Sequence, residues 1–381
     1  MRDLVEIGMG RTARRAYGLD EVEIVPSRRT RSSQDVSTGW QIDAYRFDIP
    51  LITHPTDAIV SPATAVAVGG LGGLGVLNAE GLWARHPNVD EALAKIEDAA
   101  DDLDSTDDLT ALTRVLQELH AAPIRPELIA EAVKQVTAAG VTAAARVSPQ
   151  RAAQLTPDLL AAGVEILVVQ GTIVSAEHVS KGGEPLNLKS FIADLDVPVI
   201  AGGVHDYRTA MHLMRTGAAG VIVGYGSGEV TTTDSVLGIG VPMATAIVDA
   251  AAARRDYLDE TGGRYVHVIA DGGIECSGDI AKAIACGADA VMLGSPLAFA
   301  KESPGQGLYW TAAAAHPSLP RSRVAPVADA GELVDLRTLL FGPSSDAEGL
   351  INLFGALRRA MAKSGYSDVK EFQKVGLTVR S

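Results

Sequence analysis

The sequence of 381 residues predicts a (β/α)8 barrel, which is an α/β fold of the TIM-barrel type. Short runs rich in Val and Ile alternate with Ala-rich stretches of helical spacing, which indicates parallel strands joined by crossover helices. Several runs are apolar at consecutive positions, as is typical of strands buried on both faces. Eight such runs, the number that a barrel requires, are residues 50–54, 75–78, 142–147, 165–170, 198–202, 220–224, 266–270 and 290–294.

The helices between these strands carry start and stop signals. Gly163, Gly217 and Gly287 each follow an apolar helical stretch, and a glycine there can take the left-handed conformation that ends a helix. Asp206 and Ser277 precede helical stretches, where a short polar side chain can cap free backbone amides. The barrel interpretation is therefore supported at both ends of its helices.

Three segments depart from the repeat within what we expect to be one domain spanning residues 1–381. Residues 1–48 form an N-terminal arm, whose six arginines between positions 11 and 31 indicate a solvated arm or a subunit contact, with phosphate binding as the alternative. Residues 86–125 form an acidic, helical insert. Residues 304–343 form a proline-rich loop excursion, followed by an amphipathic helix expected over residues 347–364.

The composition argues against several classes of protein, among them nucleic-acid-binding, disulfide-rich, metal-binding and membrane-spanning proteins. A net charge of −14 opposes binding to a nucleic-acid backbone. Two cysteines ten residues apart, with no Cys/His cluster, predict neither a disulfide framework nor a metal site. Residues 61–79 are free of charge, but their five glycines favour a helix, a turn and a buried strand over a membrane span. Without the apolar core of a signal peptide near the start, we expect a cytoplasmic protein.

Two glycine-containing loops follow the last two expected strands. Asp271-Gly272-Gly273 ends the seventh run and Gly294-Ser295 ends the eighth. Glycines let backbone amides approach a phosphate, the helices that follow point their positive ends at it, and Asp271 can accept both hydroxyls of a ribose. The alternative is that these glycines only permit tight turns. Their pairing on adjacent late strands favours an anion cradle.

The motif VIADGGIECSGDIAKAIACGADAVMLGS, residues 268–295, resembles the phosphate-binding half of the IMP dehydrogenase/GMP reductase family. Similar stretches are YGLDEVEIVPS from Tyr17, IPLITHPTDAIVSP from Ile49, GVIVGYGSGEVTTTDSVLGIGVP from Gly220 and FGPSSDAEGLINLFGALRRAMAKSGYSD from Phe341. The resemblance implies a homotetrameric barrel that binds a purine 5'-monophosphate together with NAD or NADP. Dehydrogenases of this family hold a monovalent metal ion in their cysteine loop, and we expect no metal here because that loop is altered. The acidic insert stands where many dehydrogenases carry CBS domains, and it is too short to encode them.

The resemblance also assigns residues. It implies a ribose contact at Asp271 and further nucleotide contacts, mainly to the phosphate, at Gly272, Gly273, Gly294, Ser295, Ser227, Gly226 and Thr53. Gln170 and Gly203 stand at family positions beside the cofactor, where the family has an aspartate and an asparagine.

The reactive position differs from the family pattern. Thr231, followed by Thr232 and Thr233, stands where the family has the cysteine whose thiolate attacks the purine. A threonine hydroxyl is a much weaker nucleophile near neutral pH than a thiol. Two hypotheses follow from the resemblance: a purine-nucleotide oxidoreductase with an altered mechanism, or a non-catalytic, nucleotide-binding regulatory homologue. A barrel enzyme of different chemistry is a third, because fold does not fix function.

Other side chains invite a catalytic interpretation. Cys276 follows the Asp-Gly-Gly turn near an expected helix start, which would lower the pKa of its thiol. His54, His205 and Glu229 fall on loops at the same end of the barrel and carry groups suited to acid/base work. For each of the four, a structural or solvated role is the competing interpretation.

Overall fold

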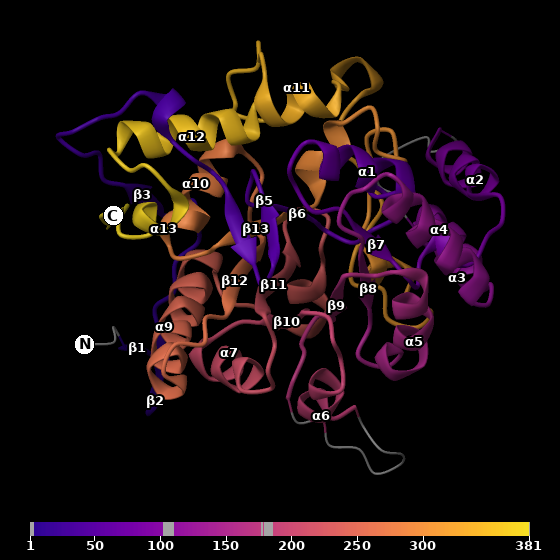
Figure 1. Ribbon diagram of the computed structural model, residues 1–381, viewed down its shortest axis with the longest axis horizontal. Coiled ribbons are helices and arrows are strands. Elements are labelled where there is room, and N and C mark those ends of the chain that lie inside the picture. The colour runs from indigo at the N-terminus through magenta and orange to yellow at the C-terminus, as the bar shows by residue number, and fades with distance from the viewer. Residues whose placement is uncertain (1–3, 102–109, 177, 179–185, 381) are drawn as a thin grey trace.

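The computed structural model describes residues 4–101, 110–176, 178 and 186–380, and it confirms the (β/α)8 barrel (Figure 1). Eight parallel strands pair in the order β6-β13-β12-β11-β10-β9-β8-β7. Their bounds are β6 Leu51–Thr53, β7 Val76–Asn78, β8 Ala144–Val147, β9 Ile166–Gln170, β10 Val199–Val204, β11 Gly220–Ser227, β12 His267–Gly272 and β13 Ala290–Leu293. Each of the eight expected runs overlaps one of these strands, and β10, β11 and β12 extend past the expected ends towards the rim.

The barrel closes between β6 and β7 through Leu74. The Leu74 amide donates to the Leu51 carbonyl at 2.9 Å, and the Thr53 amide donates to the Leu74 carbonyl at 2.9 Å. The Thr53 hydroxyl accepts the amide of Val76 at 2.8 Å. These bonds bring the carboxyl ends of all eight strands to one rim, where barrels of this class place their active sites.

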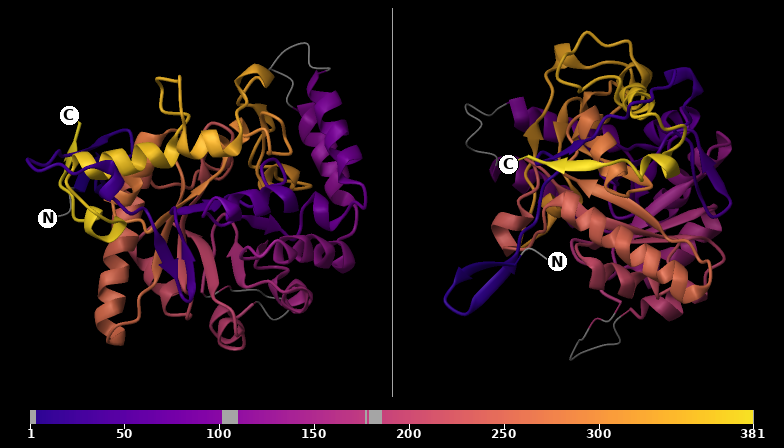
Figure 2. Two further views of the ribbon diagram at one scale, coloured as in Figure 1. Left: turned by 45° about the horizontal axis from the view of Figure 1, so that its top comes forward. Right: turned by 90° about the vertical axis from the view of Figure 1, so that its left-hand side faces the viewer.

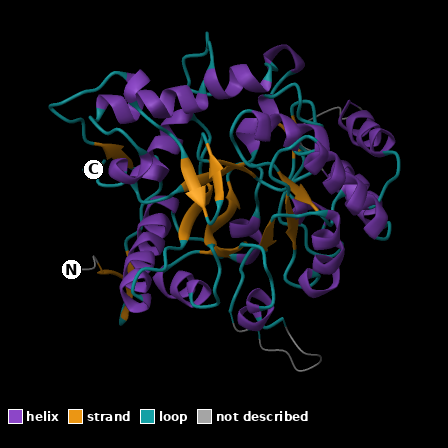
Figure 3. Cartoon of the chain, in the orientation of Figure 1, coloured by secondary structure: helices purple, strands orange, loops and turns teal. Residues whose placement is uncertain are grey.

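Helices enclose the barrel on its outside (Figure 3). They are α1 Pro62–Gly70, α4 Pro126–Ala138, α5 Ala152–Ala162, α6 Leu188–Ala193, α7 Tyr207–Met214, α9 Met243–Thr261 and α10 Ser277–Ala285. Gly163, Gly217 and Gly287 have φ of 103°, 100° and 118°, so the predicted left-handed helix ends are confirmed. No helix in the described part of the chain is long and apolar enough to span a membrane.

The two predicted helix starts differ in outcome. The Asp206 side chain accepts the Thr209 amide at 2.8 Å and caps α7, as predicted. The expectation that Ser277 caps α10 is wrong, because Ser277 is the first helical residue and Cys276 precedes it. The carboxylate of Asp279 accepts the amides of Glu275 and Cys276 at 3.1 and 3.2 Å, so the cap comes from inside the helix.

The N-terminal arm contains two hairpins. β1 Leu4–Gly8 and β2 Arg11–Arg14 form an exposed hairpin that projects from the body in the right-hand view of Figure 2. β4 Trp40–Ile42 and β5 Tyr45–Phe47 form the second, whose Trp40, Ile42 and Phe47 pack against the inner core of the barrel. Between them lie β3 Val22–Ile24, which pairs with β16 Leu377–Val379 near the C-terminus, and η1 Ser33–Asp35.

The acidic insert contains two helices at the edge of the molecule, outside α4 (Figure 1). These are α2 Val89–Asp101 and α3 Thr110–Ala121, preceded by η2 Leu82–Ala84. Most of the acidic run at residues 97–108 lies outside the described residues. Leu112, Leu116 and Leu119 are the buried face of α3, which explains how a charged insert still packs onto the barrel.

The loop excursion is irregular, as predicted, and crosses the rim of the barrel. It contains β14 Leu308–Tyr309, η4 Ala312–Ala315, β15 Ala325–Pro326, η5 Ala330–Glu332 and α11 Leu336–Phe341. Three further short elements are η3 Ser295–Phe299, α8 Thr233–Leu237 and α13 Val369–Phe372. The helix expected over residues 347–364 begins later, as α12 Leu353–Lys363, because the Asp346 carboxylate accepts the amides of Glu348 and Leu350 and holds a turn there.

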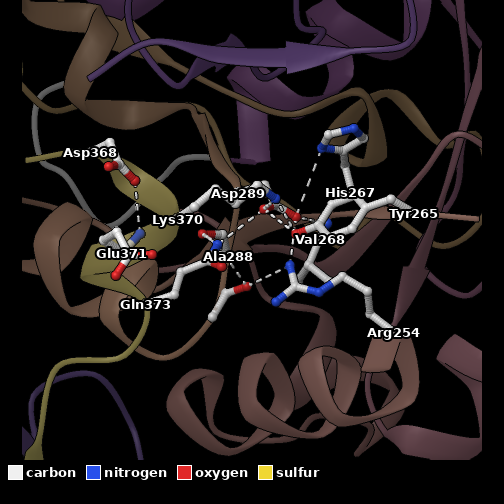
Figure 4. Close-up of polar contacts among 11 residues, drawn as sticks. Arg254, Tyr265, His267, Val268, Ala288, Asp289, Asp368, Lys370, Glu371 and Gln373 are labelled. Atoms are coloured by element: carbon white, nitrogen blue, oxygen red, sulfur yellow. Dashed lines mark hydrogen bonds and ion pairs between the residues drawn. The ribbon is translucent and has the colours of Figure 1, made fainter. Parts of the chain in front are cut away.

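A buried carboxylate, Asp289, fastens the C-terminal segment to the barrel (Figure 4). Its two oxygens accept hydrogen bonds from Arg254 at 2.7 Å, Val268 N at 2.8 Å, Tyr265 at 2.7 Å, Lys370 at 2.6 Å and Gln373 at 3.0 Å. Burial raises the pKa of Asp289, but the charges of Arg254 and Lys370 outweigh it and hold this pKa below its usual range.

We therefore expect Asp289→Asn to lower the free energy of unfolding by about 3 kcal/mol, because Arg254 loses its buried counter-ion. Urea denaturation at pH 7 measures this change. Since the pKa is depressed in the folded state, the stabilisation is present above the unfolded carboxyl pKa of about 3.9 and is lost as the pH falls towards the folded value. The matched control is Glu371→Gln on α13, which breaks an exposed ion pair with Lys374. This substitution should change the free energy of unfolding little. Equal effects of the two substitutions would contradict this role of Asp289.

Candidate active site

A small cavity lies at the carboxyl ends of β11, β12 and β13, where the sequence predicts the anion cradle. Its lining includes Gly226, Ser227, Glu229, Thr231, Asp271, Gly272, Gly294, Ser295 and Tyr309. Most of the residues predicted to bind nucleotide are thus brought together. The cavity measures about 20 Å³, which is room for one water molecule.

Asp271 lies at the centre of this site, at the end of β12, and is 1% exposed. The side-chain amide of Gln170 donates to its Oδ2 at 2.8 Å, and His54 Nε2 lies 3.7 Å from the same oxygen. Burial raises the pKa of Asp271 well above its usual value, and the bond from Gln170 offsets only part of this shift. Burial and the charge of Arg146 lower the pKa of His54 to about 3. Burial therefore favours an uncharged carboxyl facing a neutral imidazole.

Two of the predicted glycines have a steric reason to lack a side chain. Gly272 has φ of 122°, and a Cβ there would collide with Ser227. A Cβ on Gly294 would collide with the hydroxyl of Tyr309. Gly273 departs from the prediction, because its amide donates to the Ser227 carbonyl at 2.7 Å and it does not line the cavity. Its amide is used within the fold.

Residues 231–233, the three consecutive threonines, are hydrogen-bonded to the loop excursion. The Thr231 hydroxyl donates to the carbonyl of Gly226, and the Thr232 amide donates to the carbonyl of Arg321 at 2.9 Å. Thr233 begins α8, and its hydroxyl reaches the same Arg321 carbonyl at 3.4 Å. The Thr231 proton is thus held by an amide oxygen, which is too weak a base to activate it as a nucleophile. Thr231 lines the cavity without an activating partner among the bonds of its side chain.

Two residues expected at the site have other contacts. The Thr53 hydroxyl is buried and accepts the Val76 amide in the barrel closure. Gly203 exchanges backbone bonds with the neighbouring loop, since its amide donates to the Gly171 carbonyl at 2.9 Å, and a Cβ there would collide with the Gly224 carbonyl. Neither lines the cavity or the cleft beside it.

That cleft, of about 1090 Å³, opens beside the cavity and is large enough for a substantial ligand. Gln170 and His54 line the cleft and also contact Asp271, so they separate the two spaces. The other walls come from the loops after β7, β8 and β9, from α3 and from the excursion near η4.

The thiol of Cys276 does not fit the catalytic interpretation. Burial raises the pKa of this thiol, contrary to the expected lowering, because desolvation outweighs the amides at the helix start. Its Sγ contacts the Asp279 carboxylate at 3.4 Å and does not line the cavity. Cys276 is therefore part of the cap of α10.

Sequence reasoning missed Tyr309 and Arg146. Tyr309 is buried against Gly294 and fills the side of the cradle, and burial beside Asp271 raises the pKa of its phenol. Arg146 extends from β8 into the cleft, where its Nη2 donates to the Gln170 carbonyl at 2.9 Å. For Arg146 the sequence offered one signal, an arginine within an otherwise apolar strand run. No local sequence pattern marked Tyr309.

The fold and the loops at its rim define a (β/α)8 barrel with a buried carboxyl beside glycine-containing turns. The family model described as the IMP dehydrogenase/GMP reductase domain matches residues 16–316, and the chain belongs to this family.

Three proteins illustrate the similarity. An uncharacterized oxidoreductase of Mycobacterium tuberculosis is 66% identical over 377 residues, which are 99% of this chain and 100% of that protein. The inosine-5'-monophosphate dehydrogenase of Aquifex aeolicus is 42% identical over 152 residues, covering 40% of this chain and 29% of the enzyme. The crystal structure of an IMP dehydrogenase/GMP reductase-like protein from Corynebacterium glutamicum has 56% identity and a TM-score of 0.94, covering 99% of this chain and 98% of that one. The first two are oxidoreductases by name and the third is named for its likeness to such enzymes, so this chain belongs to a family of redox enzymes.

The buried carboxyl predicts a specific pH dependence of stability. Because the pKa of Asp271 is raised in the folded state, the unfolded chain releases this proton at lower pH, and stability declines as the pH rises above about 3.9. Asp271→Asn removes this decline. The free energy of unfolding of this variant, relative to that of the wild type, should therefore increase from pH 5 to pH 8. Urea denaturation across this range measures the difference. The exposed Asp256→Asn serves as the control, and a difference that does not change with pH would rule out a protonated Asp271.

Proposed function

We propose that this protein is an oxidoreductase that binds a purine 5'-monophosphate, IMP or GMP, in the cradle and uses NAD or NADP as its redox partner. The buried carboxyl of Asp271, set among the loop ends of β11, β12 and β13, is the observation that carries this proposal. A carboxyl with few internal donors suits a ribose, whose two hydroxyls can both donate to it. The names of the relatives agree with this substrate class.

The backbone around Asp271 supports the assignment of the phosphate. Gly272, Gly294 and Ser295 line the cavity, and close approach of their amides to an anion is possible because the glycines lack side chains. The cavity is too small for a nucleotide while Tyr309 lies against Gly294. Nucleotide entry therefore requires Tyr309 and its part of the excursion to move outward.

The volume of the cleft beside Gln170 and its position next to the cradle support the proposal of a nicotinamide cofactor. When bound, such a cofactor accepts or donates a hydride. In this arrangement Gln170 bonds Asp271 on the cradle side and lines the cleft on the other, so it orients both reactants. His54 is neutral at pH 7, since its pKa is about 3, so it stands at the boundary between them as an uncharged hydrogen-bonding group and not as a general base.

Because Thr231 replaces the family cysteine, two versions of this function are possible, one catalytic and one regulatory. Turnover in this protein requires a route without a thiolate adduct, because Thr231 has no thiol, and its hydroxyl donates to the Gly226 carbonyl. That bond specifically favours a second candidate, a regulatory homologue that binds the nucleotide without converting it. In either version we propose a homotetramer, for which the exposed Leu4, Ile7 and Met9 of the β1–β2 hairpin supply an apolar contact surface.

Calorimetric titration of IMP, GMP and XMP tests the nucleotide assignment. We expect at least one to bind, and we expect Asp271→Asn to weaken that binding by about 10-fold to 100-fold. Two ribose hydroxyls that donate to Asp271 favour its ionised form, which accepts from both, whereas an amide cannot ionise. Asp256→Asn, which alters an exposed carboxylate, should bind like the wild type. Failure of all three nucleotides to bind would refute the proposal.

Absorbance of reduced nicotinamide on the same samples distinguishes the enzyme from the regulator. Turnover that survives in Thr231→Val would establish a route independent of this hydroxyl. Binding without turnover, together with a gain of slow turnover in Thr231→Cys, would instead assign the protein to the regulatory class.

A further inference from the structure

Three arginines share one glutamate in the wall of the cleft. Arg146 Nη1 lies 3.7 Å from Glu80 Oε1, and Arg151 Nε lies 3.5 Å from Glu80 Oε2. Arg85 joins them through its Nε, which donates to the Glu80 backbone carbonyl at 2.9 Å. One carboxylate cannot balance three guanidinium groups, so this cluster keeps an excess of positive charge.

The excess is not offset elsewhere in the cleft. Arg321 adds a fourth guanidinium from the excursion, and Glu80 is the one acid among the described residues that line this space. Asp57, which is buried and lies 3.6 Å from His120, also attracts Arg85 and Arg146, so two carboxylates stand against four guanidinium groups. A local positive charge of this kind stands out in a chain with a net charge of −14, and it attracts small anions to this part of the surface.

The arginines retain capacity for a ligand. The side chain of Arg151 is 44% exposed and its ion pair with Glu80 is made through Nε, so much of its guanidinium group is accessible to a ligand. Burial lowers the pKa of Arg146 and of Arg321, so an anion would restore stabilisation that these guanidinium groups lose by desolvation. Helix α5 starts at Ala152, directly after Arg151, and its positive end adds to the same field.

We infer that this cleft contains an anion-binding subsite for a phosphorylated small molecule, formed by Arg85, Arg146 and Arg151 and separate from the Asp271 cradle. A guanidinium group matches a phosphate in shape and donates two parallel hydrogen bonds to it. Through its bond to the Gln170 carbonyl, Arg146 connects the subsite to the residue that also holds Asp271. The inference stands on the cleft itself and does not require the proposed purine nucleotide.

Isothermal titration with inorganic pyrophosphate at low salt tests the subsite on the intact protein. We expect binding that weakens as salt is added, and we expect Arg151→Gln to weaken it by about tenfold. Arg125→Gln is the matched control, because Arg125 has a side chain 41% exposed, pairs with Glu127 and does not line the cleft. No binding of pyrophosphate, or equal weakening by the two substitutions, would overturn the inference.

A competition experiment separates this subsite from the cradle. Pyrophosphate affinity that stays unchanged in saturating IMP supports two sites, whereas displacement by IMP would assign the arginines to the nucleotide phosphate and overturn a separate subsite. Arg151→Gln should bind IMP like the wild type. If IMP does not bind at all, the proposed function fails while the pyrophosphate titration still decides this inference.

Discussion

The burial of the Asp271 carboxyl at the rim of the barrel is the constraint on which the site depends. Barrel closure through Leu74 brings β6 and β7 together, and the converging strand ends leave Asp271 buried, with Gln170 as its hydrogen-bond donor. Burying a carboxyl in that position costs folding free energy. A protein keeps such a buried group where the group has a function. Asp289 shows the contrast, since its five donors and two cations make it purely stabilising.

Two spaces with different characters meet at this carboxyl. The cradle is small, closed by Tyr309 and lined in part by glycines, whereas the cleft is large and carries arginines. Gln170 and His54 form the boundary between them, so a group bound in one space lies next to a group bound in the other. This arrangement suits transfer between two reactants, and it also suits a sensor in which one ligand alters the affinity for a second.

The fold was predictable from sequence because the barrel depends on repeated local signals. Each strand run is apolar, and glycines such as Gly163 and Gly287 end the helices before them, so the signals agree along the chain. The contents of the site were less predictable. Gly273 and Thr53 match the family pattern in sequence, yet their amide and hydroxyl are used by backbone partners. Tyr309 enters the cradle from an irregular excursion, and the Arg146 cluster depends on Glu80 from a different loop, so tertiary packing alone determines both.

A crystal structure of the protein grown with saturating IMP would test the central claim most directly. The account predicts that both ribose hydroxyls lie within hydrogen-bond distance of the Asp271 carboxyl, with the phosphate on the amides of Gly272, Gly294 and Ser295 and with Tyr309 displaced. A nucleotide bound only among the arginines of the cleft, with Asp271 still facing Gln170 in a closed cavity, would contradict it.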